Sequence, residues 1–379
     1  MSGDFGTGGV AEDRRWMGEA LALAAEVLGT TWPNPAVGCL LVRDGGVVVG
    51  RGATRPGGRP HAETVAVREA GPHARGATAY VTLEPCAHAR PDGPCADLLA
   101  EAGVARVVVA LRDPDPRVRG DGIARLRAAG ITVEVGCREA EAWDLNAGHL
   151  KRVARGLPFC ALKLAQSLDG RIATATGESR WITGEAARAE GHRLRARHDA
   201  VMVGSGTALA DDPLLTCRDA PGLEHRSPVR VVADRRLRLP PASRLARSAR
   251  EVPVWVVTGP EADEAAAEAL SSLGCEVLRV PDAADGEAAG MPRVLAALAG
   301  RGITRLLVEG GAGVAAALLR DHLVDRLHLF TAPLVLGAES LPSVGQLGLD
   351  RLADAPRWRR VEGRALGDDR LDVLDAAAP

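Results

Sequence analysis

Aromatic residues are scarce in this sequence, which has one Tyr, three Phe and six Trp among 379 residues. A platform that stacks the bases of single-stranded nucleic acid is therefore not expected. Charge of one sign is also lacking, since 47 Lys and Arg face 49 Asp and Glu. Affinity for polymeric phosphate depends on excess positive charge, so we expect no nucleic-acid partner. Small phosphorylated ligands need only a local group of Arg side chains and backbone N–H groups, and they stay compatible with this composition.

Long apolar runs are absent too, and no uninterrupted stretch of 18 apolar residues occurs. We therefore expect no membrane-spanning helix and no membrane partner. Residues 1–11 are expected to form a disordered tail, because they are glycine-rich and lack the pattern of a secretory signal. The seven Cys are an odd number without the spacing of a disulfide framework. These features predict a cytoplasmic protein in which cysteines that come together bind a metal.

The length exceeds what one hydrophobic core usually serves, so two domains are expected. Apolar periodicity predicts a first α/β domain of three layers over residues 12–150. Its helices are predicted over 12–28, with Asp13 as the N-cap, and over 62–69, 95–102, 122–129 and 138–153. Its strands are predicted over 37–42, 47–50, 77–83, 104–111 and 131–135. The segment Arg155-Gly156-Leu157-Pro158 is polar and contains Gly and Pro, so we place the domain boundary there.

A second α/β alternation follows, and we assign residues 156–376 to it. Strands are predicted over 159–164, 200–203, 229–233, 254–257 and 305–308. Helices are predicted over 185–197, 261–273, 292–299 and 314–321. Residues 281–290 (PDAADGEAAG) are too polar to be buried and predict a surface loop. No internal repeat is visible, so the two halves are different modules.

Three residues of the first domain form a set of metal ligands. His61 opens a predicted helix, Cys86 follows a strand, and Cys95 opens the next helix. One imidazole and two thiolates leave the fourth position of zinc open for water, which is typical of a catalytic site. Zinc lowers the pKa of that water towards about 7. Glu63, two residues after His61, would take a proton from the water and pass it to leaving ammonia. A lone His-x-Glu occurs by chance and a lone Cys is usually core, but the combination predicts a deaminase.

Two glycine-rich turns of the second domain follow predicted strands. The first, residues 306–313 (LLVEGGAG), runs from an apolar strand into a helix, where backbone N–H groups can hold a phosphate. The second, residues 204–207 (GSGT), lacks the third glycine of a Rossmann fingerprint. Neither is a Walker loop, which needs Gly-Lys-Ser/Thr. Each turn alone is equally compatible with a tight turn and with a phosphate site.

The motifs of the first domain resemble those of the bifunctional riboflavin-biosynthesis deaminase/reductase family. They are TWPNPAVGC (31–39), PHAE (60–63) and YVTLEPCAH (80–88). The loop to the second cysteine usually reads His-x-Gly-x-Thr-Pro-Pro-Cys in that family, whereas this chain has HARPDGPC (88–95). The resemblance implies a cytidine-deaminase-like domain with one zinc per chain, held by His61, Cys86 and Cys95. It also implies that Asn34 holds the pyrimidine edge, although an Asn-Pro turn residue explains Asn34 equally well.

The second half continues the same resemblance, which covers about 340 residues in order. Its motifs are ALKLAQSLDG (161–170), GESRWIT (177–183), LRAR (194–197), GSGT (204–207), ADDPLLTCR (210–218) and EGGAG (309–313). They imply a domain similar to dihydrofolate reductase, with a mixed sheet and helices on both faces rather than a Rossmann fold.

The resemblance also implies which residues hold each ligand of the reductase. NADPH would be held by Ala165, Trp181, Thr207, Asp211, Gly311, Ala312, Gly313, Val314, Ala315, Ala316 and Ala317, with Arg235 at the 2′-phosphate. The substrate would be held by Ser179, Arg195, Leu215, Arg218 and Glu309. Arg195 and Arg218 suit a clamp on a 5′-phosphate. Lys163 would reach the open-chain sugar and act with Glu309 in catalysis. The alternatives are solvated surface charges for the Arg residues and core packing for Trp181.

The implied function is two successive steps of riboflavin biosynthesis. The first is zinc-dependent deamination of 2,5-diamino-6-ribosylamino-4(3H)-pyrimidinone 5′-phosphate. The second is NADPH-dependent reduction of the ribosyl group to give 5-amino-6-ribitylamino-uracil 5′-phosphate. We also expect a homo-oligomer. The alternatives are a nucleic-acid base deaminase, which the charge balance and the second domain disfavour, and a non-catalytic regulatory module, which the presence of Glu63 disfavours.

Overall fold

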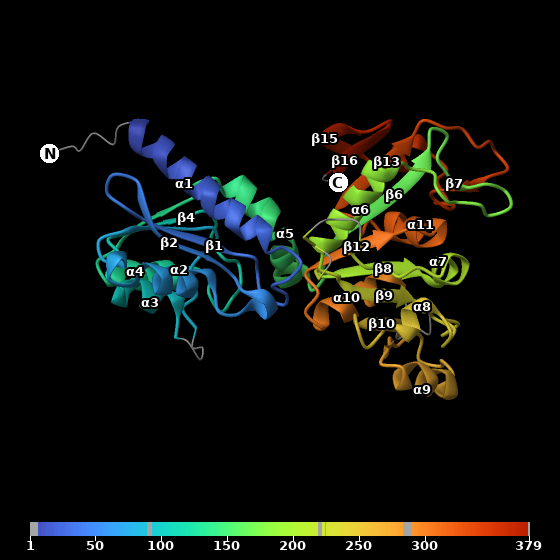
Figure 1. Cartoon of the computed structure of the whole chain (residues 1–379), viewed down its shortest axis with the longest axis horizontal. Helices are drawn as coiled ribbons and strands as arrows, with labels where there is room; N and C mark the ends of the chain where they lie inside the picture. Colours follow the sequence, from blue (N-terminus) through green and yellow to red (C-terminus); the bar gives the residue numbers. More distant parts are fainter. Residues whose placement is uncertain (1–6, 89–92, 219–221, 224, 283–289, 378–379) are drawn as a thin grey trace. The chain divides into compact units, whose positions relative to one another are not determined.

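The structure is a computed structural model that describes residues 7–88, 93–218, 222–223, 225–282 and 290–377. The chain forms two compact units, Met1–Gly156 and Leu157–Pro379, and the division falls within the boundary segment named above. Each unit is described separately below (Figure 1). In the described parts of the chain, no helix is both long and apolar enough to cross a bilayer.

The first unit is built on a five-stranded sheet with the order β2-β1-β3-β4-β5. The strands are β1 (Gly38–Arg43), β2 (Val47–Ala53), β3 (Thr78–Val81), β4 (Arg106–Val109) and β5 (Thr132–Val135). β1 pairs antiparallel with β2 and β3, whereas β3, β4 and β5 are parallel. The hairpin β1–β2 turns through Gly45 and Gly46, which both have positive φ, as the Asp-Gly-Gly signal predicts.

Helices cover both faces of this sheet. They are α1 (Thr7–Glu26), α2 (Ala62–Ala70), α3 (Cys95–Glu101), α4 (Asp121–Ala128) and α5 (Glu139–Arg155). α1 contacts α5, and α3 contacts both α2 and α4. Figure 1 shows these two groups on opposite sides of the sheet. The three-layer arrangement predicted for this unit is therefore confirmed.

The beginning of α1 differs from the prediction. Residues 7–11 are helical rather than part of a tail, and residues 1–6 lie outside the described residues. Helix propagation is favourable once the packed turn at Trp16 has formed, so α1 extends into solvent before it. Asp13 is not an N-cap. Asp13 lies inside α1, and its carboxylate accepts hydrogen bonds from Tyr80 and Arg106, at 2.6–2.8 Å.

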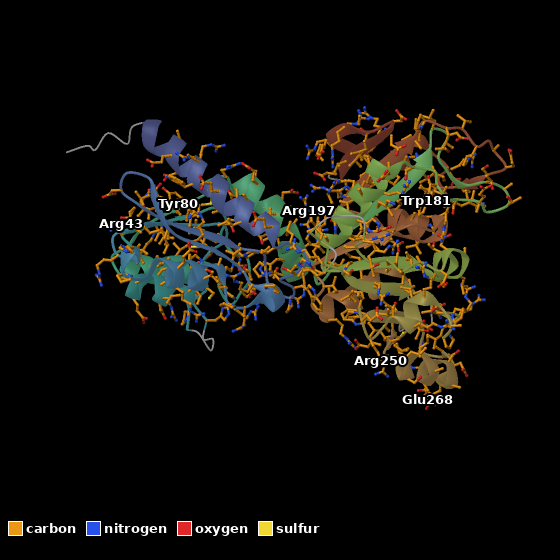
Figure 2. The ribbon with its side chains drawn as sticks, viewed as in Figure 1. Arg43, Tyr80, Trp181, Arg197, Arg250 and Glu268 are labelled. Carbon is orange, nitrogen blue, oxygen red and sulfur yellow. The ribbon has the colours of Figure 1, made fainter. Side chains whose placement is uncertain are left out.

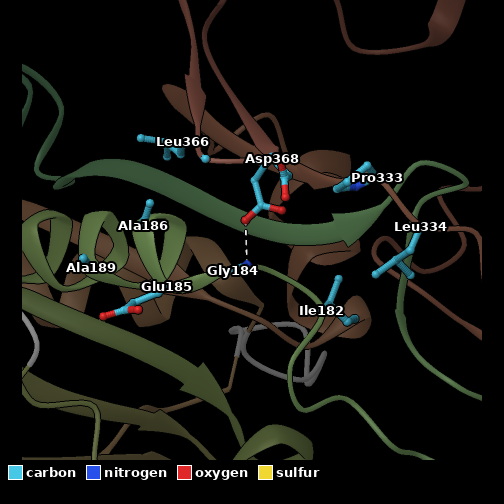
Figure 3. A pocket seen from close by; sticks show the side chains of 11 residues that line it. Ile182, Gly184, Glu185, Ala186, Ala189, Pro333, Leu334, Leu366 and Asp368 are labelled. Atoms are coloured by element: carbon cyan, nitrogen blue, oxygen red, sulfur yellow. Dashed lines mark hydrogen bonds between the residues drawn. The ribbon is translucent and has the colours of Figure 1, made fainter.

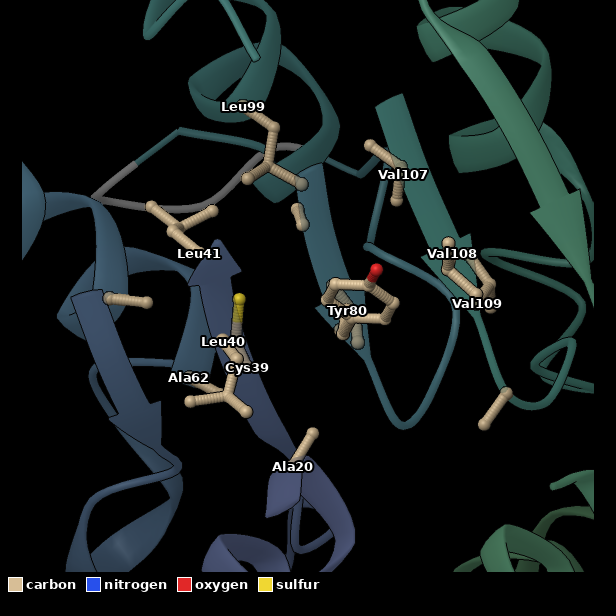
Figure 4. Packing of buried hydrophobic residues seen from close by; sticks show 14 of the residues in the cluster. Ala20, Cys39, Leu40, Leu41, Ala62, Tyr80, Leu99, Val107, Val108 and Val109 are labelled. Carbon is tan, nitrogen blue, oxygen red and sulfur yellow. The ribbon is translucent and has the colours of Figure 1, made fainter. Parts of the chain in front are cut away.

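Close contact between β2 and α2 fixes the helix that carries the first site. A Cβ at Gly52 would lie 2.0 Å from the Ala62 carbonyl oxygen, and one at Gly50 would lie 2.3 Å from the Ala66 carbonyl oxygen. The backbone of α2 therefore rests directly on the strand. Ala62 also belongs to the buried cluster shown in Figure 4, where Cys39 and Leu40 of β1 pack beside Tyr80 of β3.

The second unit contains a nine-stranded sheet with the order β11-β10-β9-β8-β12-β6-β13-β16-β15. The strands are β6 (Phe159–Ser167), β8 (Ala200–Gly204), β9 (Val229–Ala233), β10 (Val254–Thr258), β11 (Glu276–Arg279), β12 (Arg305–Glu309), β13 (Arg326–Ala332), β15 (Trp358–Leu366) and β16 (Asp369–Ala376). The strands from β11 to β13 are parallel, and β16 and β15 add antiparallel pairs. The mixed sheet confirms the prediction of a fold like dihydrofolate reductase.

Six helices are described in this unit. They are α6 (Glu185–Ala196), α7 (Ser205–Asp211), α8 (Arg244–Arg247), α9 (Glu264–Ser272), α10 (Met291–Gly300) and α11 (Ala312–Arg320). A two-stranded sheet of β7 (Arg171–Ala173) and β14 (Leu341–Pro342) completes the unit. Most of the predicted surface loop 281–290 lies outside the described residues, which leave out 283–289.

Candidate active sites

The three predicted metal ligands come together in the first unit. His61 is the residue before α2, Cys86 follows β3, and Cys95 begins α3. Their ligand atoms all lie within 4.8 Å of one another, and the Cys95 sulfur is 3.7 Å from His61 Nδ1. Within the described ranges, no other group of three or more His, Cys, Asp or Glu is placed to hold a metal. Two sulfurs and one imidazole nitrogen suit zinc and leave one tetrahedral position for a further ligand.

Glu63 lies in the first turn of α2, where it is buried two residues after the ligand His61. Cys39 of β1 is its electrostatic neighbour. Burial, reinforced by the charge of Glu63, raises the pKa of the Cys39 thiol well above its usual range. The Glu63 carboxylate is therefore buried close enough to the Cys39 thiol to disfavour its ionised form.

Asn34 has a clear structural partner. Its side-chain N–H donates to the Gly58 carbonyl oxygen at 2.9 Å, which joins the loop before β1 to the short 3-10 helix Pro56–Gly58. Gly58 has φ +85°, and a Cβ there would lie 2.4 Å from Asn34 Nδ2. The turn role of Asn34 is thus present, and its contact with a pyrimidine stays a prediction. Residues 89–92, which carry most of the altered loop to Cys95, lie outside the described residues.

Two cations and one carboxylate form the centre of the second unit. Glu309 at the end of β12 is in register with Lys163 on β6, and their charged groups are 3.9 Å apart. Arg195 of α6 donates to both carboxylate oxygens of Glu309, at 2.5 and 2.8 Å. The side chains of Glu309 and Arg195 are only 10% and 14% exposed. The structure therefore joins three residues that the sequence placed in one site.

These contacts set the charges at the centre. Burial raises the pKa of Glu309, but the charge and hydrogen bonds of Arg195, helped by Lys163, outweigh it and lower that pKa to about 2. Burial lowers the pKa of Lys163, as does the charge of Arg195, while Glu309 opposes them. The site thus holds a firmly ionised carboxylate beside an ammonium that gives up its proton more readily than a surface lysine.

The predicted phosphate clamp is brought together at Thr216. Arg195 donates to its carbonyl oxygen at 2.9 Å, and Arg218 donates to its hydroxyl oxygen at 3.2 Å. Arg218 is exposed, whereas Arg195 is held by Glu309. His192, which the sequence analysis missed, lies three residues before Arg195 on α6, with Nδ1 3.0 Å from the same carbonyl oxygen. Leu215 is buried beside them with φ +55°.

The two glycine turns of the second unit lie against each other. A Cβ at Gly204 would lie 2.6 Å from a methyl carbon of Val314, and one at Gly311 would lie 3.0 Å from Thr207 Oγ1. Gly310 and Gly311 have positive φ and lead directly into α11, a helix of nine residues. This cradle suits the phosphates of a dinucleotide at a helix N-terminus. Of the predicted contact residues, Gly313 is exposed and the turn residues Gly311 and Ala312 are half-buried.

Two of those predicted contact residues, Ala315 and Ala316, are buried. Their methyl groups pack into the unit because they face the sheet side of α11. Of the predicted contact residues 311–317, a cofactor would therefore contact the first few rather than all seven.

Trp181, labelled in Figure 2, is 68% exposed, which excludes the alternative of core packing. The guanidinium of Arg188 lies 4.7 Å from its ring. Its neighbour Arg180 donates to the Asp211 carbonyl oxygen at 2.7 Å, so the loop that carries Trp181 reaches α7. Two further predicted contacts are only partly buried, Ser179 in that loop and Ala165 on β6.

Arg235 is engaged by a carboxylate. It donates to both oxygens of Asp282, at 2.6 and 3.0 Å. A phosphate at Arg235 would therefore compete with this carboxylate. Arg238, which the sequence analysis did not single out, donates to Ser205 Oγ at 2.6 Å, and its Nε lies 3.8 Å from a carboxylate oxygen of Asp234. Ser205 follows Gly204 directly, so Arg238 is the cation tied to the glycine turns. The three Arg residues that follow β9 (235, 236 and 238) are the sequence feature that could have indicated a cation at this place.

A pocket of about 710 Å³ lies elsewhere in the second unit, and none of the predicted site residues lines it (Figure 3). It is bounded by the start of α6, the residues after β13 and the turn between β15 and β16. Asp369 accepts a hydrogen bond from the Gly184 N–H at 2.6 Å, and both residues line the pocket. Its polar side chains, Glu185, Asp368 and Asp369, are all acidic.

Comparison with known proteins identifies the family of each unit. Residues 10–111 match the cytidine and deoxycytidylate deaminase zinc-binding region, and residues 158–371 match the RibD C-terminal domain. The riboflavin biosynthesis protein RibD of Escherichia coli K12 is 41% identical over 368 residues, which are 94% of this chain and 98% of that protein. The same-named protein of Aquifex aeolicus is 39% identical over 357 residues, 94% of this chain and 96% of the relative.

Solved structures extend this agreement to the whole fold. RibD of Acinetobacter baumannii (form 1) has a TM-score of 0.87 and 38% identity, and covers 97% of this chain and 100% of its own. A Thermotoga maritima structure has a TM-score of 0.85 and 34% identity, with the same coverage. It is described as a diaminohydroxyphosphoribosylaminopyrimidine deaminase/5-amino-6-(5-phosphoribosylamino)uracil reductase.

The fold and sites define a bifunctional enzyme, with a deaminase unit of the zinc-binding type followed by a reductase unit. The donor set of the first unit and the glycine cradle of the second fit zinc and a nicotinamide cofactor. The chain belongs to the RibD family of riboflavin-biosynthesis proteins. It deaminates and then reduces its substrate in that pathway.

Proposed function

We propose that the first unit removes the 2-amino group of 2,5-diamino-6-ribosylamino-4(3H)-pyrimidinone 5′-phosphate as ammonia. The second unit then reduces the ribosyl group with NADPH, giving 5-amino-6-ribitylamino-uracil 5′-phosphate. The observation that carries this proposal is the convergence of His61, Cys86 and Cys95 beside buried Glu63, in the same chain as the Lys163–Glu309 pair. The description of the Thermotoga maritima relative supports the choice of substrates.

In the deaminase site, His61, Cys86 and Cys95 would hold one zinc per chain. Bound zinc acidifies water and so supplies a nucleophile at neutral pH. Glu63 would accept a proton from the attacking water and return it to the departing amino group, so the net change would be water in and ammonia out. The Gly58 carbonyl holds Nδ2 of Asn34, and this fixes the amide so that Oδ1 can accept from the pyrimidine edge.

In the reductase site, Arg218 and Arg195 would bind the 5′-phosphate. Arg218 is the exposed donor, while Arg195 orients Glu309. NADPH would supply, when bound, a hydride for C1′ of the open-chain imine. Lys163, whose pKa is lowered by burial, supplies the proton that the imine nitrogen needs. Glu309 holds Lys163 and Arg195 in place and accepts from the sugar hydroxyls.

The preference for NADPH over NADH would come from the Arg residues that follow β9. Arg235 donates to both oxygens of Asp282, so a 2′-phosphate at Arg235 would compete with that carboxylate. Arg238 lies at the glycine turns already. We therefore propose that Arg238 meets the 2′-phosphate together with Arg235.

The test is a pair of assays on the purified full-length chain. With the diaminopyrimidine substrate, ammonia release should precede NADPH consumption. Removing zinc with a chelator should stop ammonia release, yet NADPH consumption should continue when the deaminated substrate is supplied. Ammonia release that survives complete removal of metal would contradict the deaminase assignment, and no NADPH consumption with the deaminated substrate would contradict the reductase assignment.

Three further proposals rest on the sequence alone: that the protein acts in the cytoplasm, that it binds no nucleic acid, and that it forms a homo-oligomer. Light scattering would give the number of chains in the particle. A filter-binding assay with tRNA at physiological salt would detect a nucleic-acid partner.

A further inference from the structure

The segment between β4 and α4, residues 110–120, lies over the metal-ligating cysteines, and we call it the β4–α4 loop. Its Val118 forms one buried cluster with Cys86 and Cys95. The exposed fractions of these residues are 3%, 6% and 0% respectively. An apolar side chain therefore packs against the two buried cysteines. The backbone N–H of Cys95 also donates to the sulfur of Cys86, at 3.4 Å.

Glu84 fastens this loop at both ends. The side chain is buried, and its carboxylate accepts three hydrogen bonds from backbone N–H groups. Oε2 accepts from Asp113 at 3.3 Å and from Gly120 at 3.1 Å, while Oε1 accepts from Ile123 at 3.3 Å. Asp113 and Gly120 lie near the two ends of the loop, and Ile123 lies in the first turn of α4. The Glu84 carboxylate thus links the two ends of the loop through hydrogen bonds.

Backbone contact ties the same region to the ligand Cys86. A Cβ at Gly122 would lie 1.8 Å from the Pro85 carbonyl oxygen, so the first turn of α4 touches the residue between Glu84 and Cys86. Asp113 in turn accepts from the Asp115 N–H at 2.9 Å and pairs with His149 of α5 at 3.2 Å. The loop is therefore held from the ligand side by Glu84 and from the helix side by His149.

We propose that the β4–α4 loop covers the zinc-bound thiolates and that Glu84 is the positioning residue that keeps it closed over Cys86 and Cys95. The proposal rests on the zinc site of the proposed function. Groups that surround a metal's ligands control their hydration and orientation, and losing one typically costs 10–100-fold in metal affinity. Both oxygens of Glu84 are used by the backbone, so it acts through the loop and not as a fourth ligand.

A carboxylate suits this position because it only accepts hydrogen bonds. Glu84→Gln replaces one oxygen with an NH₂ group, which donates and cannot pair with a backbone N–H. At least one of the three N–H groups then loses its acceptor in a buried place. Val118→Ala is the complementary change, since it removes the cover but keeps every hydrogen bond of Glu84.

The experiment uses the full-length chain in both zinc and cobalt forms. Zinc affinity is measured by competition with a chelating dye. Accessibility of the sulfurs is measured as the alkylation rate of Cys86 and Cys95 by mass spectrometry, with half-buried Cys137 as the internal reference. The cobalt–thiolate charge-transfer band reports the geometry of the ligands. Hydrogen exchange of peptides from β3 and β4 shows that the first unit of each variant is folded, and Glu134→Gln on β5 is the matched control.

Glu84→Gln should bind zinc at least about 10-fold more weakly and shift the cobalt band. Val118→Ala should speed alkylation of Cys86 and Cys95 several-fold, relative to Cys137, with wild-type hydrogen exchange in β3 and β4. Wild-type zinc affinity and spectrum in Glu84→Gln would overturn the role of Glu84, and wild-type alkylation in Val118→Ala would overturn the cover. A wild-type chain that binds no zinc would instead contradict the proposed function itself.

Discussion

Replacing Glu309 by Gln should destabilise the second unit by about 3 kcal/mol at neutral pH. The carboxylate is buried and bridges Arg195 and Lys163, so its ionised form is bound tightly by the folded state. A pKa lowered from 4.5 to about 2 corresponds to about 3 kcal/mol, because each pKa unit is worth roughly 1.4 kcal/mol. Loss of one partner from a buried ion pair typically costs about 3–5 kcal/mol, which is consistent with this value.

The pH dependence follows from the direction of the shift. Glu309 has a lower pKa in the folded state than in the unfolded chain, so its stabilising effect is complete above about pH 5. It is lost as the pH falls through the folded value of about 2. The difference in stability between wild type and Glu309→Gln should therefore shrink to about 2 kcal/mol at pH 3.5.

Hydrogen exchange of peptides from β6 and β12, measured over a series of urea concentrations, would give this free energy for the second unit alone. Glu264→Gln is the matched control, because Glu264 is 77% exposed in its pair with Arg279 and should contribute less than about 1 kcal/mol. A cost below about 1 kcal/mol for Glu309→Gln at pH 7, or a cost that does not fall with pH, would refute the reasoning.

Elemental analysis should find about one zinc per chain, and the double variant Cys86→Ser/Cys95→Ser should lose it; full retention of zinc would contradict the ligand set. Glu63→Gln should keep zinc but deaminate at least about 100-fold more slowly, with reductase activity intact, because an amide cannot act as the base. A fragment that begins at Phe159 should reduce the deaminated substrate without zinc, and a folded fragment that binds no cofactor would remove the reductase assignment. Arg238→Ala should weaken NADPH binding about tenfold or more without affecting NADH, unlike the control Arg236→Ala; equal effects on both cofactors would rule out contact with the 2′-phosphate.

The strands that are buried on both faces could be predicted from the sequence, because their runs of Val, Leu and Ala have no other explanation. Examples are β8 and β12, whose observed bounds agree with the predicted ranges to within one residue. Of the nine-stranded sheet, β11, β13, β15 and β16 were missed. β15 is exposed along almost its whole length and carries Arg and Glu, so pairing with β16 holds it in place rather than burial of a hydrophobic face.

The convergence of His61, Cys86 and Cys95 could be predicted because a zinc site restricts the types of residue and where they lie on helices and strands. The ion pairs of the second unit could not be predicted from the sequence. Arg195 and Glu309 are 114 residues apart, and Arg235 and Asp282 are 47 apart. A guanidinium binds a carboxylate and a phosphate with the same geometry, so the sequence alone does not show which partner each Arg meets.

The ligand set at His61, Cys86 and Cys95 uses only residues of the first unit, and the Lys163–Arg195–Glu309 centre uses only residues of the second. A substitution that inactivates one centre therefore need not affect the activity of the other. In genetic terms, a gene copy carrying Glu63→Gln and a second copy carrying Glu309→Gln should complement each other, because each supplies the step that the other lacks. A cell with both copies would make its own riboflavin, although neither allele alone supports growth without the vitamin.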